Sequence, residues 1–134
     1  MCSDDRNNCS SCISEILRKI LLLQRQDFNC DNFAGCDKPF LGPTPTSICY
    51  NTRPIQLYNC CTGVPWSFDY TLVDGTTGTT DILRIESMDD CCCTCRLLYR
   101  TADGVITGTT NFVTIDLKCT GAIRCLEDTY VELC

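Results

Sequence analysis

The chain has 134 residues, which suits one domain, and its apolar fraction of 44% is ordinary for a globular protein. The net charge of −6 argues against a nucleic-acid partner, because phosphate binding requires clustered Lys and Arg. The longest aliphatic run, Ile20 to Leu23, is far shorter than the roughly 20 residues of a membrane span. We therefore expect a single domain over residues 1–134, with neither nucleic acid nor membrane as a partner.

Residues 11–26 form the one convincing helix pattern, in an N-terminal, cysteine-bearing arm that we assign to residues 1–30. Apolar residues recur there at spacings of three and four, which places them on one helix face: Ile13, Ile16, Leu17, Ile20 and Leu21. Leu22 and Leu23 widen the apolar face. The helix is therefore expected to contact other elements on more than one side.

Residues 31–65 read as an irregular segment, because Asp, Asn, Gly and all five prolines interrupt it. Short strands are predicted at 46–50 and 55–59. The segment holds too little apolar material for a core of its own, so we keep it in the same domain.

In residues 66–134 apolar and polar residues alternate, as they do in strands that bury one face. The apolar positions of the first such stretch are Trp66, Phe68, Tyr70 and Leu72. Asp74-Gly75 and Asp103-Gly104 are hairpin-turn signals inside two similar stretches, 74–80 and 103–110, which predict two similar loops. The prediction is a mainly β protein: an antiparallel β-sandwich of six to eight strands, of which a jelly roll is one form, preceded by one amphipathic helix.

The most informative feature is cysteine, which occurs 15 times in a chain that has no histidine. Such density normally marks secreted domains too small to build a core. This chain is larger, and its polar, acidic start (residues 1–6) does not resemble a signal peptide. An odd number also leaves at least one thiol after intramolecular pairing. We therefore expect the surplus cysteines to form bonds between subunits.

Strand geometry divides the clustered cysteines, because neighbouring side chains point to opposite faces. In 91–100 the mostly apolar set reads as inward: Cys91, Cys93, Cys95, Leu97 and Tyr99. The set with two arginines reads as outward: Cys92, Thr94, Arg96, Leu98 and Arg100. The same parity places one of Cys60 and Cys61 inside and the other outside.

Two other cysteine chemistries compete with crosslinking. Cys9-Ser-Ser-Cys12 is a Cys-x-x-Cys pair that suits a four-thiolate metal site or a redox pair at a helix start. No second Cys-x-x-Cys is present and no βαβ pattern surrounds the first, so we expect neither a metal nor another cofactor. Without histidine the chain also lacks an ordinary Ser–His or Cys–His nucleophile, and we expect no enzymatic activity.

Two C-terminal stretches resemble the cysteine-rich CotZ/CotY/ExsY proteins of bacterial spore outer coats and exosporia. One is Glu86-Ser87-Met88 with the run Asp89 to Leu98, and the other is Thr110 to Leu126, whose most specific part spans 115–126. The N-terminal pattern of cysteines, an aliphatic helix ending in Gln, and spaced cysteines is similar too. The resemblance implies a self-assembling subunit of the spore surface, made in the mother-cell cytosol without a signal peptide and locked by disulfides after assembly. Its partners would be copies of itself and other coat proteins.

Alternatives in the same compartment remain open: a subunit of a disulfide-linked spore appendage fibre, or an adaptor that anchors coat components without polymerising. We assign candidate intersubunit thiols to terminal or outward positions: Cys2, Cys9, Cys12, Cys134 and Cys92. Candidate intramolecular or core cysteines are Cys93, Cys95, Cys119, Cys125, Cys30 and Cys36.

Overall fold

The structure is a computed structural model that describes residues 12–25 and 50–133. The described part contains one α-helix, seven strands and a short 3₁₀ turn, η1. In chain order they are α1 (Cys12–Arg25), β1 (Ile55–Asn59), β2 (Phe68–Thr71), β3 (Thr77–Thr80), β4 (Ile82–Asp89), β5 (Cys92–Arg100), β6 (Ile106–Asp116), η1 (Leu117–Cys119) and β7 (Thr120–Cys125). The expected mainly β architecture after a single helix is confirmed.

Five strands form one antiparallel sheet in the order β6-β5-β4-β1-β7, and β2 pairs with β3 in a separate hairpin. Strand β1 comes from the proline-rich part of the chain, within residues 31–65, yet it pairs with both β4 and β7. Its predicted bounds of 55–59 are confirmed. Of the strand predicted at 46–50, only residue 50 lies among the described residues, and it is not in a strand.

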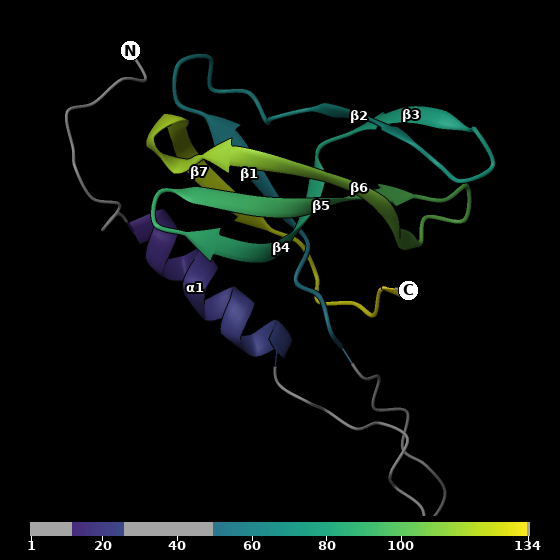
Figure 1. Ribbon diagram of the computed structural model, residues 1–134, viewed down its shortest axis with the longest axis horizontal. Coiled ribbons are helices and arrows are strands. Elements are labelled where there is room, and N and C mark those ends of the chain that lie inside the picture. The colour runs from purple at the N-terminus through teal and green to yellow at the C-terminus, as the bar shows by residue number, and fades with distance from the viewer. Residues whose placement is uncertain (1–11, 26–49, 134) are drawn as a thin grey trace, which may run out of the picture.

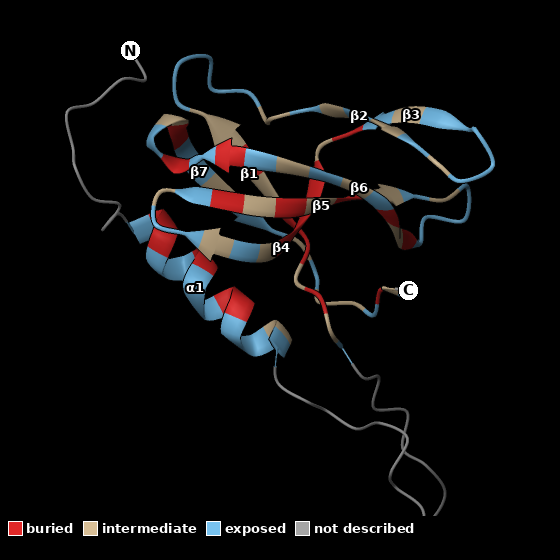
Figure 2. Cartoon of the chain, viewed as in Figure 1, coloured by how far each residue is buried: buried red, intermediate tan, exposed pale blue. Residues whose placement is uncertain are grey.

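The helix packs beside β4, and the β2–β3 hairpin lies over β5 and β6 (Figure 1). The sheet curls without closing into a barrel, because its edge strands β6 and β7 do not pair with each other. The main core lies between these elements and includes Leu17 and Ile20 of the helix with Leu57, Leu83 and Ile85 of the sheet. Figure 2 shows these buried positions as a stripe along the helix and across the central strands.

The opposite side of the sheet is covered as well. Ile82, Leu98, Ile106 and Val131 form a second, smaller core against the C-terminal segment. Leu98 is therefore fully buried, and the prediction that its whole strand face points outward is wrong. Sequence parity correctly separates the two faces of β5, but it does not reveal that residues 126–133 return to cover the second one.

The two similar loops predicted from the sequence have the same hydrogen-bond pattern. In the first, the Gly75 N–H donates to the Leu72 carbonyl, and the Leu72 N–H donates to the Thr76 carbonyl. In the second, the Gly104 N–H donates to the Thr101 carbonyl, and the Thr101 N–H donates to the Val105 carbonyl. Both glycines have positive φ angles of 91° and 84°, which side chains with a Cβ rarely adopt, and this explains the Asp-Gly signal.

Candidate functional site

Cys93 and Cys95 form a sealed pair of thiols in the main core. Both side chains are 0% exposed, both cysteines are free, and their Sγ atoms lie 3.9 Å apart on the same face of β5. The interaction with Cys93 and burial together raise the pKa of Cys95 well above its usual value. The predicted inward orientation is confirmed for these two residues, and burial keeps both thiols away from oxidants and from neighbouring molecules.

The exposed free thiols lie on different elements. They are Cys12 at the start of α1, Cys60 after β1, Cys92 at the start of β5 and Cys125 at the end of β7. A free thiol can exchange disulfides only where another molecule can reach it. The described residues therefore present four accessible attachment points rather than one reactive centre.

Several predicted orientations need correction. Cys125 is exposed rather than inward, because it ends the edge strand β7, and Cys119 is half-buried in η1. Cys60 and Cys61 are both exposed, because they lie in a turn after β1 where strand parity no longer applies. Cys61 and Cys91 each take part in a disulfide. The other predicted candidates lie outside the described residues: Cys2, Cys9, Cys30, Cys36 and Cys134.

Cys92 lies at an acidic tip of the sheet. It follows the tight β4–β5 turn, in which Asp90 adopts a positive φ of 57°. Its register partners are Asp89 on β4 and Asp116 on β6, and all three carboxylates are exposed. Lys118 is the exposed basic residue nearest in sequence to Asp116. The predicted outward position of Cys92 is confirmed.

Cys125 lies in the wall of a groove of about 550 Å³ between the β5–β6 turn and the segment after β7. Arg100 contributes to the same wall. Arg53 lies close enough to act electrostatically on Cys125, and it also holds Asp128 through a two-pronged ion pair at 2.7 and 2.9 Å. Burial in the groove raises the pKa of the Cys125 thiol, and Arg53 partly offsets this effect.

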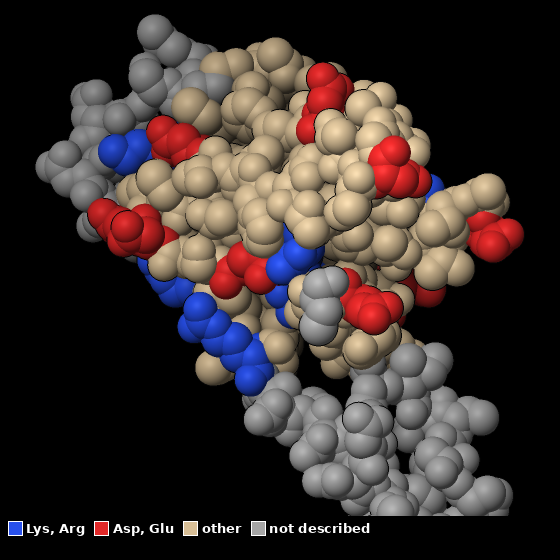
Figure 3. All heavy atoms as spheres, turned by 45° about the vertical axis from the view of Figure 1, so that its right-hand side comes forward, with Lys and Arg blue, Asp and Glu red and all other residues tan. Residues whose placement is uncertain are grey.

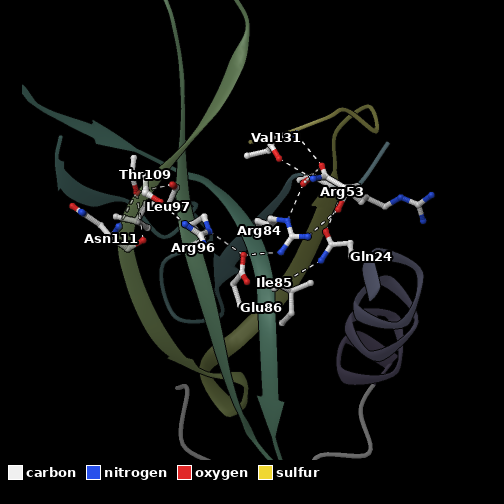
Figure 4. A network of polar contacts seen from close by, with 12 residues as sticks. Gln24, Arg53, Arg84, Ile85, Glu86, Arg96, Leu97, Thr109, Asn111 and Val131 are labelled. Carbon is white, nitrogen blue, oxygen red and sulfur yellow. Dashed lines mark hydrogen bonds and ion pairs between the residues drawn. The ribbon is translucent and has the colours of Figure 1, made fainter. Parts of the chain in front are cut away.

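A polar network that sequence reasoning missed fixes the segments around these thiols (Figure 4). Buried Arg84 donates to the Thr52 hydroxyl at 2.8 Å, to the Asn51 carbonyl at 2.9 Å and to Glu86 at 2.7 Å. Asn51 in turn exchanges two hydrogen bonds with the backbone of Val131. The sequence signal for this network is weak, because Arg84 and Glu86 alternate with Leu83 and Ile85 as they would on a solvent-facing side of a strand.

The network extends to the helix through Gln24. Its side chain donates to the Ile85 carbonyl at 2.8 Å and accepts from the Arg53 N–H at 3.0 Å. The end of α1 is thereby joined both to β4 and to the segment before β1. The elements that carry Cys12 and Cys125 thus belong to one hydrogen-bonded framework.

Charge is distributed unevenly over the surface (Figure 3). The helix carries exposed Arg18, Lys19 and Arg25 against Glu15, whereas acidic side chains are spread over the rest of the face in view. Within residues 12–25 and 50–133, no three or more Cys, Asp or Glu side chains gather to hold a metal ion. No helix in these ranges combines the length and apolarity needed to cross a membrane.

Comparison with known proteins identifies one family. The family model for spore coat protein Z matches residues 1–106 of the 134, which include α1, strands β1 to β5 and, at the acidic tip, Asp89, Asp90 and Cys92. The match ends before residues 115–126, the stretch that carries the most specific part of the resemblance seen in the sequence. Neither the curated proteins nor the solved structures contain a significant match. The chain belongs to the spore coat protein Z family, and it is accordingly a structural protein of the spore coat rather than an enzyme.

Proposed function

We propose that this protein is a self-assembling subunit of the bacterial spore surface, in the coat or exosporium, and that disulfides between subunits lock the assembly. The observation that carries the proposal is the placement of four exposed free thiols on four separate parts of the fold, while Cys93 and Cys95 are sealed. A subunit with several accessible thiols in different directions can bond to more than one neighbour. Membership in a structural coat family supports the same conclusion.

Synthesis in the mother-cell cytosol belongs to this proposal. Thiols remain reduced in that compartment, so subunits would first associate noncovalently and become crosslinked later. Random oxidation of fifteen cysteines before folding would instead give mixed aggregates. Other coat proteins are the second class of partner that we expect, through the same exposed thiols.

The terminal cysteines remain our first candidates for locking: Cys2, Cys9, Cys12 and Cys134. Replacing all four by serine should leave the particles intact but make them dissolve on heating in detergent without reductant. If this quadruple variant stays as heat-resistant as the parent, the locking bonds are at other residues. Cys92 and one cysteine of the 60–61 turn are then the next candidates, and of these two Cys60 is the free one.

The function itself is tested by size-exclusion chromatography and negative-stain microscopy of purified protein, both reduced and oxidised. We expect extended particles in both states and resistance to detergent only after oxidation. A monomer in both states at high concentration would contradict self-assembly and favour an adaptor. Filaments in place of sheets would identify an appendage subunit.

A further inference from the structure

We propose that Asp103-Gly104 in the β5–β6 turn is a site of spontaneous isoaspartate formation, and that the β2–β3 turn protects the matching pair Asp74-Gly75 from the same reaction. The inference goes beyond the proposed function, because it concerns a covalent change within one chain. The two turns share their backbone hydrogen bonds and their glycine geometry. They differ in the contacts of the aspartate side chain, and that difference is the basis of the proposal.

The sequence favours two places for this reaction. Isoaspartate forms when the backbone nitrogen of the following residue attacks the aspartate side chain, and glycine obstructs the attack least because it has no Cβ. Of the eight glycines in the chain, only Gly75 and Gly104 follow an aspartate, and none follows an asparagine. Both Asp-Gly pairs are exposed, and a Cβ built at either glycine would meet nothing within 4 Å. Water therefore reaches both pairs.

The reaction needs no enzyme, cofactor or oxidant. The nitrogen of Gly104 bonds to the side-chain carboxyl carbon of Asp103 and loses its proton, and one carboxyl oxygen leaves as water. A second water then opens the five-membered succinimide ring. Opening at the side-chain carbonyl restores aspartate, whereas opening at the backbone carbonyl gives isoaspartate with a free α-carboxylate. Isoaspartate has the same atoms as aspartate, but its backbone is longer by one methylene.

The attacking nitrogen is held in the same way in both turns. The Gly75 N–H donates to the Leu72 carbonyl at 2.9 Å. The Gly104 N–H donates to the Thr101 carbonyl, also at 2.9 Å. Each turn must open this hydrogen bond before the nitrogen can attack. The glycines therefore do not distinguish the two sites.

The Asp74 carboxylate is held by its own turn. It accepts a hydrogen bond from the Thr76 N–H at 2.9 Å, a contact that aspartates in turns often make with the backbone two residues further on. This hydrogen bond lowers the pKa of Asp74. The neutral carboxyl group accepts a nucleophile far better than the carboxylate, whose negative charge opposes the attack. The contact with Thr76 thus keeps Asp74 in its less reactive form.

In the β5–β6 turn a hydroxyl group replaces the carboxylate as acceptor. The Val105 N–H, which corresponds to that of Thr76, donates to the Thr101 hydroxyl at 3.3 Å. Thr101 corresponds to Leu72 of the first turn, which has no hydroxyl. Within the part of the chain that the structure describes, the Asp103 carboxylate has no hydrogen-bond or ion-pair partner. No contact of this kind has to be broken before Asp103 reacts.

The modified turn borders the groove that holds Cys125. Gly104 and Val105 line this groove together with Cys125. The bond between residues 103 and 104 lies inside both hydrogen-bonded rings of the turn, which are closed by the contacts of Thr101 with Gly104 and with Val105. An additional methylene there changes the geometry of both rings. Isoaspartate at residue 103 would therefore alter the groove wall beside Cys125 without a change in sequence.

The test compares the two sites within one molecule of the natural chain, kept reduced. The folded protein is aged in mildly acidic buffer made with oxygen-18 water, because each succinimide opening leaves one oxygen-18 atom on the residue concerned. Mass spectrometry of peptides prepared in ordinary water gives the labelled fraction at each aspartate, and electron-transfer fragmentation identifies isoaspartate. Asp103 should take up label about fivefold faster than Asp74, which is the factor that one net hydrogen bond contributes to an equilibrium.

The same protein unfolded in guanidinium is the control, because both aspartates lose their turn contacts there and should take up label at similar rates. Equal labelling of Asp103 and Asp74 in the folded protein, faster labelling of Asp74, or no label at Asp103 while the unfolded chain reacts would overturn the proposal. An equally large preference for Asp103 in guanidinium would also overturn it, because the sequence and not the turn would then set the rates.

Thr101→Val tests the cause of the difference. It removes the hydroxyl acceptor but keeps the shape of the side chain, so Asp103 should accept from the Val105 N–H as Asp74 accepts from its own turn. Labelling of Asp103 should then slow toward the rate at Asp74. Thr110→Val, at an exposed position of β6 outside the turn, is the matched control and should leave the rate unchanged. An unchanged rate in Thr101→Val, or equal slowing in the control, would refute the role of the hydroxyl, and the comparison within the natural chain depends on neither variant.

Discussion

Arg84 and Arg96 lie directly opposite each other on neighbouring strands β4 and β5. Like charges in such a pair normally destabilise a sheet. Here both guanidinium groups donate to the same carboxylate oxygen of Glu86, at 2.7 and 3.1 Å. Arg96 also packs on the ring of Phe112 at 4.6 Å. Glu86 therefore neutralises a pair of cations that the sheet register brings together.

Replacing Glu86 by Gln should destabilise the fold by about 2 kcal/mol, because two partly buried cations lose their shared counter-charge. Urea unfolding in the presence of reductant measures the effect. Glu132→Gln, a neutralised exposed carboxylate, is the matched control and should change the unfolding free energy by less than about 0.5 kcal/mol. Equal effects of the two variants would show that the Glu86 network contributes nothing specific.

Cys93 and Cys95 should resist alkylation in the folded protein, because neither side chain is exposed. The folded protein is first treated with an isotopically light maleimide. It is then unfolded in guanidinium without reductant and treated with an isotopically heavy maleimide. Both residues should carry the heavy label, whereas Cys60 and Cys92 carry the light one. Light label on Cys93 or Cys95 would contradict their burial, and no label before reduction would show that they are bridged.

The pH dependence of Cys125 alkylation should show that this thiol is partly buried in the groove. Burial raises the pKa of this thiol, so less of it is thiolate at a given pH than in the unfolded chain. The pH–rate profile of Cys125 in the native protein should therefore be displaced upward from its profile in guanidinium. Site-resolved mass spectrometry of timed alkylation gives both curves, and coincident profiles would contradict the raised pKa.

The ion pair of Arg53 and Asp128 should make a small, pH-dependent contribution to stability. The hydrogen bond from Arg53 lowers the pKa of Asp128, so the folded state binds its proton less readily than the unfolded state. The contribution is present above the unfolded pKa of about 4 and is lost as the pH falls through the folded value. Both side chains are 37% exposed, which limits it to about 0.5 kcal/mol.

Asp128→Asn should be less stable than the parent by this amount at pH 7 and equally stable at pH 2. Urea unfolding at both pH values measures the difference in unfolding free energy and its sign. A variant that is equally stable at pH 7, or that still differs at pH 2, contradicts the linkage.

Local patterns predicted much of this fold. Helical spacing identified α1, alternation identified the faces of β5, and Asp-Gly pairs identified two hairpin turns. The errors arise where distant segments meet: Leu98 was assigned to solvent because the sequence does not show Val131 packing over it. Cys125 was placed among the intramolecular or core candidates because the sequence does not show that it ends an edge strand. Burial at such positions depends on strand order, which short-range periodicity does not encode.

The hydrogen bonds between Asn51 and Val131 also affect the order in which the fold can be completed. They join residues that are 80 positions apart in sequence, and Val131 belongs to the second core. Contacts between residues so far apart form late, because the long intervening loop must first be closed. The sheet face that Val131 covers is therefore exposed in a partly folded chain and is protected only when this last contact is made.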